Sequence, residues 1–369
     1  MSDSLLHQIA LTRLPQVGAV TAKTLVSYCG SAEAVFSATK RELLRIPGIG
    51  QATVAGLKPH DALLAAEREL DFLQQHGVEA LFYTDSRYPP RLRQNPDCPA
   101  LLFFKGSDPA LLDAARIVAV VGTRQPTEYG RALCEELIDG LMPLDVVLVS
   151  GLAFGIDITA HRRACQQGLP NIGVLGHGLG SIYPNQHKST AHKMIENGGL
   201  LSEYVHDVGP DREHFPMRNR IIAGLCDALV VVETGQTGGS IISAELAAQY
   251  TREVFAFPGR VRDQNSIGCN QLIKNNRAHL IESVEDLVTL MGWTAEGASA
   301  TSVQTSLFPD LDDDELRLTA LLREKPGLAI DELSDAAGLL HGNLARLLLG
   351  LEFKGVIRTL PGKRYRMSG

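Results

Sequence analysis

The chain has 369 residues, a net charge of −7 at pH 7, and a composition that is 44% hydrophobic and 21% charged. This length suits two or three domains, each with a sizeable apolar core. The densest apolar runs have about five residues, whereas a membrane-spanning helix needs about 20. No basic stretch followed by an apolar run marks the amino terminus for export. These features exclude a membrane protein and predict a cytoplasmic one.

Six cysteines are scattered along the chain, and no two of them have a spacing typical of metal ligands. We therefore expect reduced thiols that act mostly as small core side chains, and neither a structural zinc site nor any other metal site. The negative net charge gives no overall attraction for nucleic acid. Any polyanion must be held by a local group of cations.

Residues 1–60 are predicted to form short helices separated by glycine turns. Residues 14–25 and 46–57 share a pattern in which an apolar residue and a glycine turn precede a helix. The second copy, with Gly48 and Gly50, is the better match, and the pattern is typical of a helix-hairpin-helix unit. Such a unit can offer backbone N–H groups to a phosphate. The alternative, a packing module without DNA contact, stays open because the second turn contains no lysine or arginine.

Strands and helices alternate over residues 61–292. Continuous apolar, β-branched runs predict strands that are buried on both faces, and the helices between them predict right-handed crossovers. The fold class expected is α/β, with a doubly wound, mostly parallel, Rossmann-like sheet. The predicted strands cover residues 116–121, 146–149, 171–175, 200–203, 227–232 and 253–256.

The remaining residues divide into a linker and a compact tail. Residues 293–311 are rich in Ala, Ser and Thr without periodicity, which is typical of a linker. Residues 312–369 follow a different pattern, with helices expected at 314–322, 330–338 and 341–353 and a hairpin that turns at Pro361-Gly362. Three helices and a hairpin predict a winged-helix domain.

Glycine-rich polar loops follow several of the predicted strands, at 122–127, 150–157, 176–180 and 234–240. In an open α/β sheet, ligands bind at the carboxyl ends of the strands. A glycine loop that enters a helix presents backbone N–H groups to an anion. The pattern predicts a phosphate-binding surface along one edge of the sheet.

Two enzymatic alternatives have little support. The glycine spacing at 176–180 does not fit a dinucleotide fingerprint, and no Walker A lysine motif is present. Asp157 and His161 are spaced to share a helix face as an acid–base pair, but a helix cap at Asp157 and a packed His161 explain both residues better. We therefore expect no cofactor and no catalytic residue.

A basic cluster lies within residues 212–224, where Arg212, Arg218 and Arg220 surround Phe215 and Asn219. Arginines and backbone N–H groups can hold the phosphates of a single strand, and an exposed aromatic ring can stack on a base, which contributes about 1–3 kcal/mol. The alternative is that one arginine pairs with Glu233 or Glu203 and that Phe215 belongs to the core.

Taken together, these segments resemble the DNA-processing protein A family, also called DprA or Smf. The resemblance covers nearly the whole chain and is carried by residues 85–92, 121–124, 150–161, 215–224 and 268–273. It implies a Rossmann-like core that forms a homodimer, binds single-stranded DNA and brings RecA to the strand during natural transformation, without catalytic turnover.

The resemblance also assigns DNA contacts to individual positions. Arg124 matches an arginine of the family, and Arg212 stands where a lysine is usual, which keeps the charge. Phe215 matches an aromatic position, and residues 238–240 match a glycine-serine loop. The complete expected set is Gly122, Thr123, Arg124, Lys188, Arg212, Phe215, Arg218, Asn219, Arg220, Gly238, Gly239 and Ser240.

The tail resembles the winged-helix domain of the same family. From residue 341 onward it has six basic residues (Arg346, Lys354, Arg358, Lys363, Arg364 and Arg366) and one acidic residue, Glu352. This asymmetry favours a second nucleic-acid contact, with double-stranded DNA. The expected recognition helix, 343–350, has a single arginine, so a protein contact stays equally open.

Two other functions remain alternatives. A phosphoribohydrolase-like enzyme uses a glycine-rich motif that ends in glutamate, and residues 238–245 are a distant match that ends at Glu245. A regulator of transcription would bind double-stranded DNA through the tail.

Overall fold

The computed structural model describes residues 3–57, 59–293, 313–324, 328–339, 341–353, 356–360 and 364–367. The chain forms two compact units, Met1–Ala295 and Glu296–Gly369. Apart from Trp293, the linker predicted over 293–311 lies outside the described residues. No helix of the described residues is long and apolar enough to cross a membrane.

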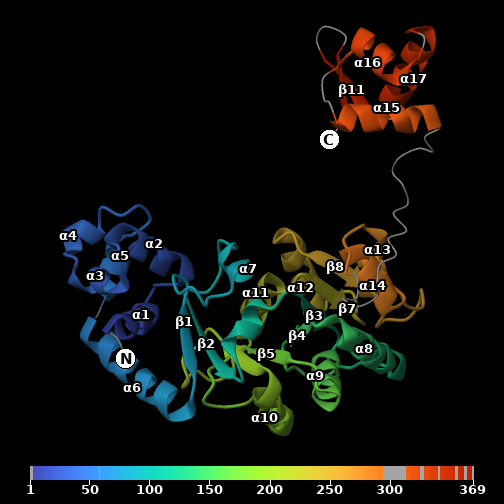
Figure 1. Cartoon of the computed structure of the whole chain (residues 1–369). Helices are drawn as coiled ribbons and strands as arrows, with labels where there is room; N and C mark the ends of the chain where they lie inside the picture. Colours follow the sequence, from blue (N-terminus) through green and yellow to red (C-terminus); the bar gives the residue numbers. More distant parts are fainter. Residues whose placement is uncertain are drawn as a thin grey trace. The chain divides into compact units, whose positions relative to one another are not determined.

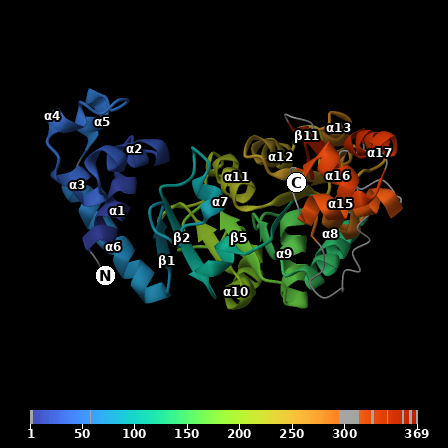
Figure 2. The ribbon, with the colours of Figure 1, turned by 45° about the horizontal axis from the view of Figure 1, so that its top comes forward.

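The first unit begins with six helices that lie beside the β1 edge of the sheet (Figure 2). Glycines at the predicted turns start two of them: Gly18 is the N-cap of α2 and Gly50 the N-cap of α5. Gly48 has φ +83°, a conformation that glycine adopts without strain. Thr39 and Glu42 form a capping box at α4. The helices are α1 (Asp3–Arg13), α2 (Ala19–Cys29), α3 (Ala32–Ser37), α4 (Lys40–Leu43), α5 (Gln51–Gly56) and α6 (Pro59–His76).

The sheet of the first unit has nine strands in the order β1-β2-β6-β5-β4-β3-β7-β8-β9. From β6 to β9 the neighbouring strands are parallel, whereas β1 and β2 are antiparallel additions at one edge. The predicted doubly wound, mostly parallel sheet is thereby confirmed. The strands are β1 (Glu79–Phe82), β2 (Leu101–Gly106), β3 (Ile117–Val121), β4 (Val147–Ser150), β5 (Asn171–Leu175), β6 (Gly199–Ser202), β7 (Ala228–Val231), β8 (Glu253–Ala256) and β9 (His279–Leu280).

Helices cover both faces of this sheet (Figure 1). One apolar core joins α8, α9 and α14 to the sheet, and a second core joins α7, α11, α12 and α13 to the opposite face. The helices are α7 (Pro90–Arg93), α8 (Glu128–Leu141), α9 (Ile156–Gln167), α10 (Lys188–Asn197), α11 (His214–Leu225), α12 (Gly239–Gln249), α13 (Ile267–Lys274) and α14 (Val284–Met291). Short 3₁₀ segments lie at Pro109–Asp113, Met142–Leu144 and Asn185–His187.

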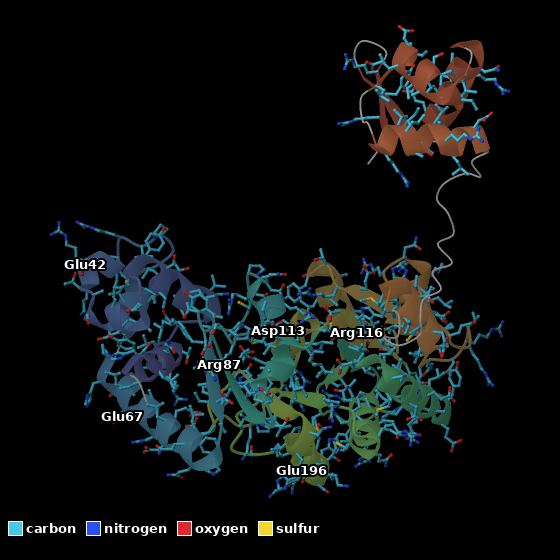
Figure 3. The ribbon with its side chains drawn as sticks, viewed as in Figure 1. Glu42, Glu67, Arg87, Asp113, Arg116 and Glu196 are labelled. Atoms are coloured by element: carbon cyan, nitrogen blue, oxygen red, sulfur yellow. The ribbon has the colours of Figure 1, made fainter. Side chains whose placement is uncertain are left out.

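The segment after β1, which contributes to the family resemblance, has a structural role. Arg87, labelled in Figure 3, pairs with Glu79 of the edge strand at 2.6 Å and with Asp85 at 2.9 Å. Tyr88 is fully buried, and its hydroxyl donates to the Pro99 carbonyl at 2.7 Å. These contacts fix the loop between the two antiparallel strands.

The order of the strands defines where a ligand site is expected. The chain proceeds outward from β3 through β4 and β5 to β6, and then returns to place β7 on the other side of β3. The loops that follow β3 and β7 therefore lead in opposite directions. This is the topological switch point at which open α/β sheets bind ligands.

The second unit contains the expected three helices, a three-stranded sheet in the order β10-β12-β11, and a leucine-rich core. This arrangement confirms the winged-helix prediction. Its elements are α15 (Asp313–Glu324), β10 (Leu328–Ala329), α16 (Ile330–Ala337), α17 (His341–Phe353), β11 (Ile357–Leu360) and β12 (Arg364–Met367). The predicted turn at Pro361-Gly362 lies outside the described residues.

Candidate nucleic-acid interface

An open groove of about 710 Å³ lies at the switch point between β3 and β7. We call it the central groove. The loops after β3, β4 and β7 and the first half of α11 form its walls. Ten of the twelve residues expected at the site line it: Gly122, Thr123, Arg124, Arg212, Phe215, Arg218, Asn219, Gly238, Gly239 and Ser240. The other two, Lys188 and Arg220, are not among the lining residues.

Two exposed arginines supply the positive charge of the central groove. Arg124 follows β3 and Arg212 precedes α11, and both side chains are exposed to solvent. Among the residues that the structure describes, no carboxylate pairs with either guanidinium. Both cations are therefore available to an incoming phosphate, which an arginine can bind through two parallel hydrogen bonds.

Aromatic rings lie next to these cations. The Arg124 guanidinium is 5.8 Å from the centre of the half-buried Phe215 ring, a cation–π distance. The Tyr183 ring lies 6.0 Å from Phe215, is 48% exposed and also lines the groove. Tyr183 was not among the expected site residues, because a single tyrosine in a loop carries no local signal. Together the rings provide apolar faces on which bases can stack.

The glycine loop after β7 leads into α12, whose amino terminus faces the groove. Gly238 is the N-cap without a side-chain hydrogen bond, and the first turn contains no acidic residue. The Ile241 N–H donates to the Gly238 carbonyl at 3.0 Å, so the N–H groups of Gly239 and Ser240 are the ones that face an external acceptor. A Cβ atom on Gly238 would lie 2.4 Å from the Thr234 Oγ1, so glycine is required by close packing. The Ser240 hydroxyl donates to that same Oγ1 at 2.7 Å.

The amino terminus of α9 differs from that of α12, because the side chain of Asp157, a residue of α9 itself, occupies it. Asp157, in the first turn, is buried, and its carboxylate accepts from the Ala153 N–H at 3.4 Å. Burial raises the pKa of Asp157, while the nearby Arg218 acts in the opposite direction. The expected cap is therefore shifted: the N-cap is Gly155, and Asp157 lies two residues inside the helix.

His161 does not form an acid–base pair with Asp157. It is fully buried, and its Nδ1 lies 3.0 Å from the Asn171 side-chain oxygen. Burial lowers the pKa of His161 to about 4. A neutral histidine packed against the sheet, the alternative favoured from the sequence, agrees with this geometry.

Arg218 lies at the floor of the groove, with little of its side chain exposed. It is 4% exposed, and its Nη1 donates to the Gly151 carbonyl at 2.6 Å and to the Val174 carbonyl. Burial lowers the pKa of Arg218 to about 10. The side chain joins the ends of β4 and β5 under the groove, so its geometry favours a positioning role.

Asn219 connects Arg218 to the glycine loop. Its Oδ1 accepts from the Arg218 Nε at 3.2 Å, and its Nδ2 donates to the Gly239 carbonyl at 3.4 Å.

Arg220 lies on another side of α11 and pairs with Glu203. Both side chains of that pair are 12% exposed. This is the alternative in which one arginine pairs with a glutamate, and in this conformation Arg220 is engaged by Glu203. Lys188 is exposed at the start of α10, outside the central groove.

Glu233 fixes the two walls of the groove to each other. It is 3% exposed and follows β7, and its backbone carbonyl accepts from the Thr123 N–H at 2.6 Å. Its carboxylate accepts from the Thr127 N–H and hydroxyl, both at 2.8 Å. One buried residue therefore holds both ends of the loop that carries Arg124.

The glutamate that the phosphoribohydrolase alternative requires lies elsewhere. Glu245 is not among the residues of the central groove, and it pairs with Arg277 at 2.8 Å. This position gives the alternative no support.

In the winged-helix unit, Arg346 of α17 is exposed, and Arg366 of β12 is half-buried. Lys354 and Lys363 lie outside the described residues. Arg346 and Arg366 therefore lie on a helix and on a strand of the hairpin, respectively.

Three segments match known families. Residues 79–292 match the DNA recombination-mediator protein A family, residues 304–363 match the DprA winged-helix domain, and residues 9–58 match the SAM-like helix-hairpin-helix tandem. The helix-hairpin-helix prediction is thereby confirmed. The first of these matches covers more than half of the chain.

Individual proteins are similar over most of their length. Protein Smf of Escherichia coli is 34% identical over 304 residues, which are 82% of this chain and 80% of that protein. The X-ray structure of DNA processing protein A from Streptococcus pneumoniae has 33% identity and a TM-score of 0.64, and the match covers 77% of this chain and 97% of that one. A structure of DNA processing protein A from Helicobacter pylori, described for its single-stranded DNA binding mode, has 30% identity and a TM-score of 0.53. The match covers 59% of this chain and 97% of that one.

Proposed function

Because the chain belongs to the DNA recombination-mediator protein A family, we propose that it binds single-stranded DNA in the central groove without reading the base sequence. One observation carries this proposal. At the switch point of the sheet, the exposed guanidinium of Arg124 has no carboxylate partner among the described residues and lies 5.8 Å from the ring of Phe215. A cation beside an aromatic face is the combination that a nucleotide needs, since it offers one contact for the phosphate and another for the base.

In this proposal the phosphates are held by Arg124, Arg212 and the N–H groups at the start of α12. Phe215 stacks on one base, and Tyr183 extends the aromatic surface. Gly122 and Thr123 belong to the wall that carries Arg124, and Gly238, Gly239 and Ser240 form the opposite wall. Arg218 and Asn219 act beneath these groups, where they hold the loops in place. Phosphate contacts by Lys188 and Arg220 stay predictions.

Recognition of this kind does not depend on the base sequence of the DNA. Every base has an aromatic face, and every nucleotide carries the same phosphate, so stacking and charge tolerate all sequences. Duplex DNA keeps its bases stacked on one another and cannot offer one to Phe215. We therefore expect the central groove to prefer unpaired strands.

The family also supports a role in handing the strand to a recombinase. We propose that the protein acts as a homodimer, protects incoming DNA and loads RecA onto it during natural transformation, in the cytoplasm and without breaking a bond. The winged-helix unit then supplies a second contact, to double-stranded DNA or to a protein.

One binding experiment tests the core of this proposal. A fluorescent poly-dT oligonucleotide is titrated with the protein at fixed salt, alone and with RecA present. We expect tight binding to the single strand, weaker binding to a duplex of the same length, and faster assembly of RecA on the bound strand. Single-strand binding that Arg124→Ala leaves unchanged would overturn the assignment of the groove. Release of free base from a nucleoside monophosphate would support the enzymatic alternative.

A further inference from the structure

A second open groove, also of about 710 Å³, lies between the start of α8 and the loop that joins β8 to α13. We call it the side groove. The residues that matter below are Glu128 and Tyr129 on one wall, and Arg260, Asp263 and Ser266 on the other. None of them was expected at a site from the sequence, and none lines the central groove.

The side groove offers the same two kinds of contact as the central groove. The Tyr129 side chain is 57% exposed, although it lies on a helix that packs on the sheet. Arg260 is exposed, and no carboxylate of the described residues pairs with it. Val261, which follows, is 88% exposed, and Arg262 is exposed as well. An exposed ring beside an exposed guanidinium fits one base and one phosphate.

The two grooves lie side by side along the carboxyl ends of the strands. Thr123 and Arg124 line the central groove, while Thr127 and Glu128, a few residues later in the same loop, line the side groove. The Asn265 Nδ2 donates to the Gln125 carbonyl at 3.4 Å, so the loop after β3 contacts the loop that carries Arg260. A chain that leaves one groove can therefore enter the other by crossing a single loop.

The loop that carries Arg260 is held in place by its own hydrogen bonds. The side chain of Asn270 accepts from the Gly259 N–H at 3.1 Å and donates to the Gly259 carbonyl at 3.0 Å. Asp263 accepts from the Asn265 N–H at 3.1 Å and from the Ser266 hydroxyl at 3.2 Å. Binding to a loop that is already ordered loses little conformational entropy.

The acidic residues of the side groove determine how a nucleotide would lie in it. Asp263 is engaged in hydrogen bonds within its own loop. Glu128 is exposed in the first turn of α8, where Thr127 already supplies the cap. Its carboxylate repels a phosphate at the helix start. The phosphate is thereby directed to Arg260, and the base to Tyr129.

We propose that the side groove continues the path of the strand, so that nucleotides next to those in the central groove bind there, with a base on Tyr129 and a phosphate on Arg260. This inference rests on the proposed function, because it takes the central groove to hold the first part of the same strand. It extends the binding site beyond the residues that the sequence indicated.

The test compares a short with a long oligo-dT, of about 6 and about 20 nucleotides, lengths on either side of a typical single-strand site. Both are titrated against the wild-type full chain and against Tyr129→Ala, Arg260→Ala and Arg68→Ala. Arg68 is an exposed arginine on α6, and its removal changes the net charge by the same amount as the loss of Arg260. The short strand fills the central groove, whereas the long strand reaches the side groove as well.

We expect the short strand to bind all four proteins alike. The long strand should bind more tightly than the short one to the wild type and to Arg68→Ala. Tyr129→Ala should lose about 5- to 150-fold of the long-strand affinity, the equivalent of one stacked base. Tyr129→Phe keeps the ring and should keep the affinity. Glu128→Gln removes the repelling charge and should bind the long strand more tightly than the wild type.

The possible failures are distinguishable. If the wild type binds neither strand, the proposed function is wrong. If the wild type binds both strands and Tyr129→Ala and Arg260→Ala keep the full long-strand affinity, the side groove lies outside the path and this inference is wrong. Because both side chains are exposed, the variants should unfold at the wild-type denaturant concentration.

Discussion

Replacing Arg124 by alanine gives the sharpest test of the central groove. Arg124 is exposed, pairs with no carboxylate of the described residues, and contacts the ring of Phe215 at 5.8 Å. Its removal should change the free energy of unfolding by less than about 0.5 kcal/mol, as is usual for a surface position. Any effect on DNA binding then reports a lost contact rather than a lost fold.

The size of that effect can be worked out in two independent ways. A hydrogen bond to a charged group contributes about 1.5–3 kcal/mol, so the affinity for single-stranded DNA should fall about 10- to 150-fold. One cation that neutralises one phosphate of a single strand contributes about 0.7 to the slope of log affinity against log salt. The slope for Arg124→Ala should therefore be smaller than the wild-type slope by about 0.7.

The assay is fluorescence anisotropy with an oligo-dT at four or five salt concentrations, with Arg68→Ala as the matched control. Arg68→Ala makes the same change in net charge on α6, away from the groove, so it accounts for any long-range effect of charge. The reasoning is refuted if Arg124→Ala and Arg68→Ala bind DNA alike and share one salt slope.

Three further predictions concern residues around the same groove. Phe215→Ala should lower the affinity about 5- to 150-fold with no change in salt slope, because stacking involves no phosphate, whereas Phe215→Tyr should bind normally. A changed slope in the salt titration would contradict this. Arg218→Ala leaves the carbonyls of Gly151 and Val174 without their buried donor. It should lower the free energy of unfolding, measured by chemical denaturation, by about 2–6 kcal/mol. A free energy of unfolding equal to that of the wild type would show that the guanidinium is not structural. Burial lowers the pKa of His161 to about 4 from an ordinary value of 6.5. Between these two pH values the unfolded chain binds a proton that the folded chain does not. The free energy of unfolding should therefore fall by about 3 kcal/mol as the pH decreases from 6.5 toward 4. His161→Gln should flatten that decline, and parallel stability–pH curves for the two proteins would rule out His161 as its origin.

Much of the fold could be predicted because its signals are local. Apolar, β-branched runs such as 117–121 and 228–231 become buried parallel strands, and the glycine loops that follow them lie at the switch point. The two antiparallel edge strands were not predicted. β1 is only four residues long and half-buried at its start, and its pairing with β2 depends on contacts across the intervening loop.

In the basic cluster of residues 212–224, Arg218 was expected to contact DNA but is buried. On α11, Arg218 shares a helix face with Ile221, Ile222 and Leu225, at spacings of three, four and seven residues, and this face is buried. That spacing is readable in the sequence, so the burial of Arg218 could have been foreseen. The partner of Arg220 could be named only as an alternative, because Glu203 reaches it through the tertiary fold.

The exposed aromatic residues could not be predicted at all. Tyr183 and Tyr129 reach their grooves from a loop and from a helix that are distant in the sequence from the basic cluster. Tyr129 follows the 122–127 loop closely, but no pattern in the sequence of either tyrosine indicates an exposed ring. Only the arrangement of the strand ends brings them beside arginines.

The two contacts of Glu233 have a kinetic consequence. Because its backbone carbonyl holds Thr123 and its carboxylate holds Thr127, both ends of the Arg124 loop are anchored, and the loop need not rearrange when a ligand arrives. Encounter should then proceed at a rate set by diffusion and charge, and substitutions in the groove should alter mainly how long the complex survives.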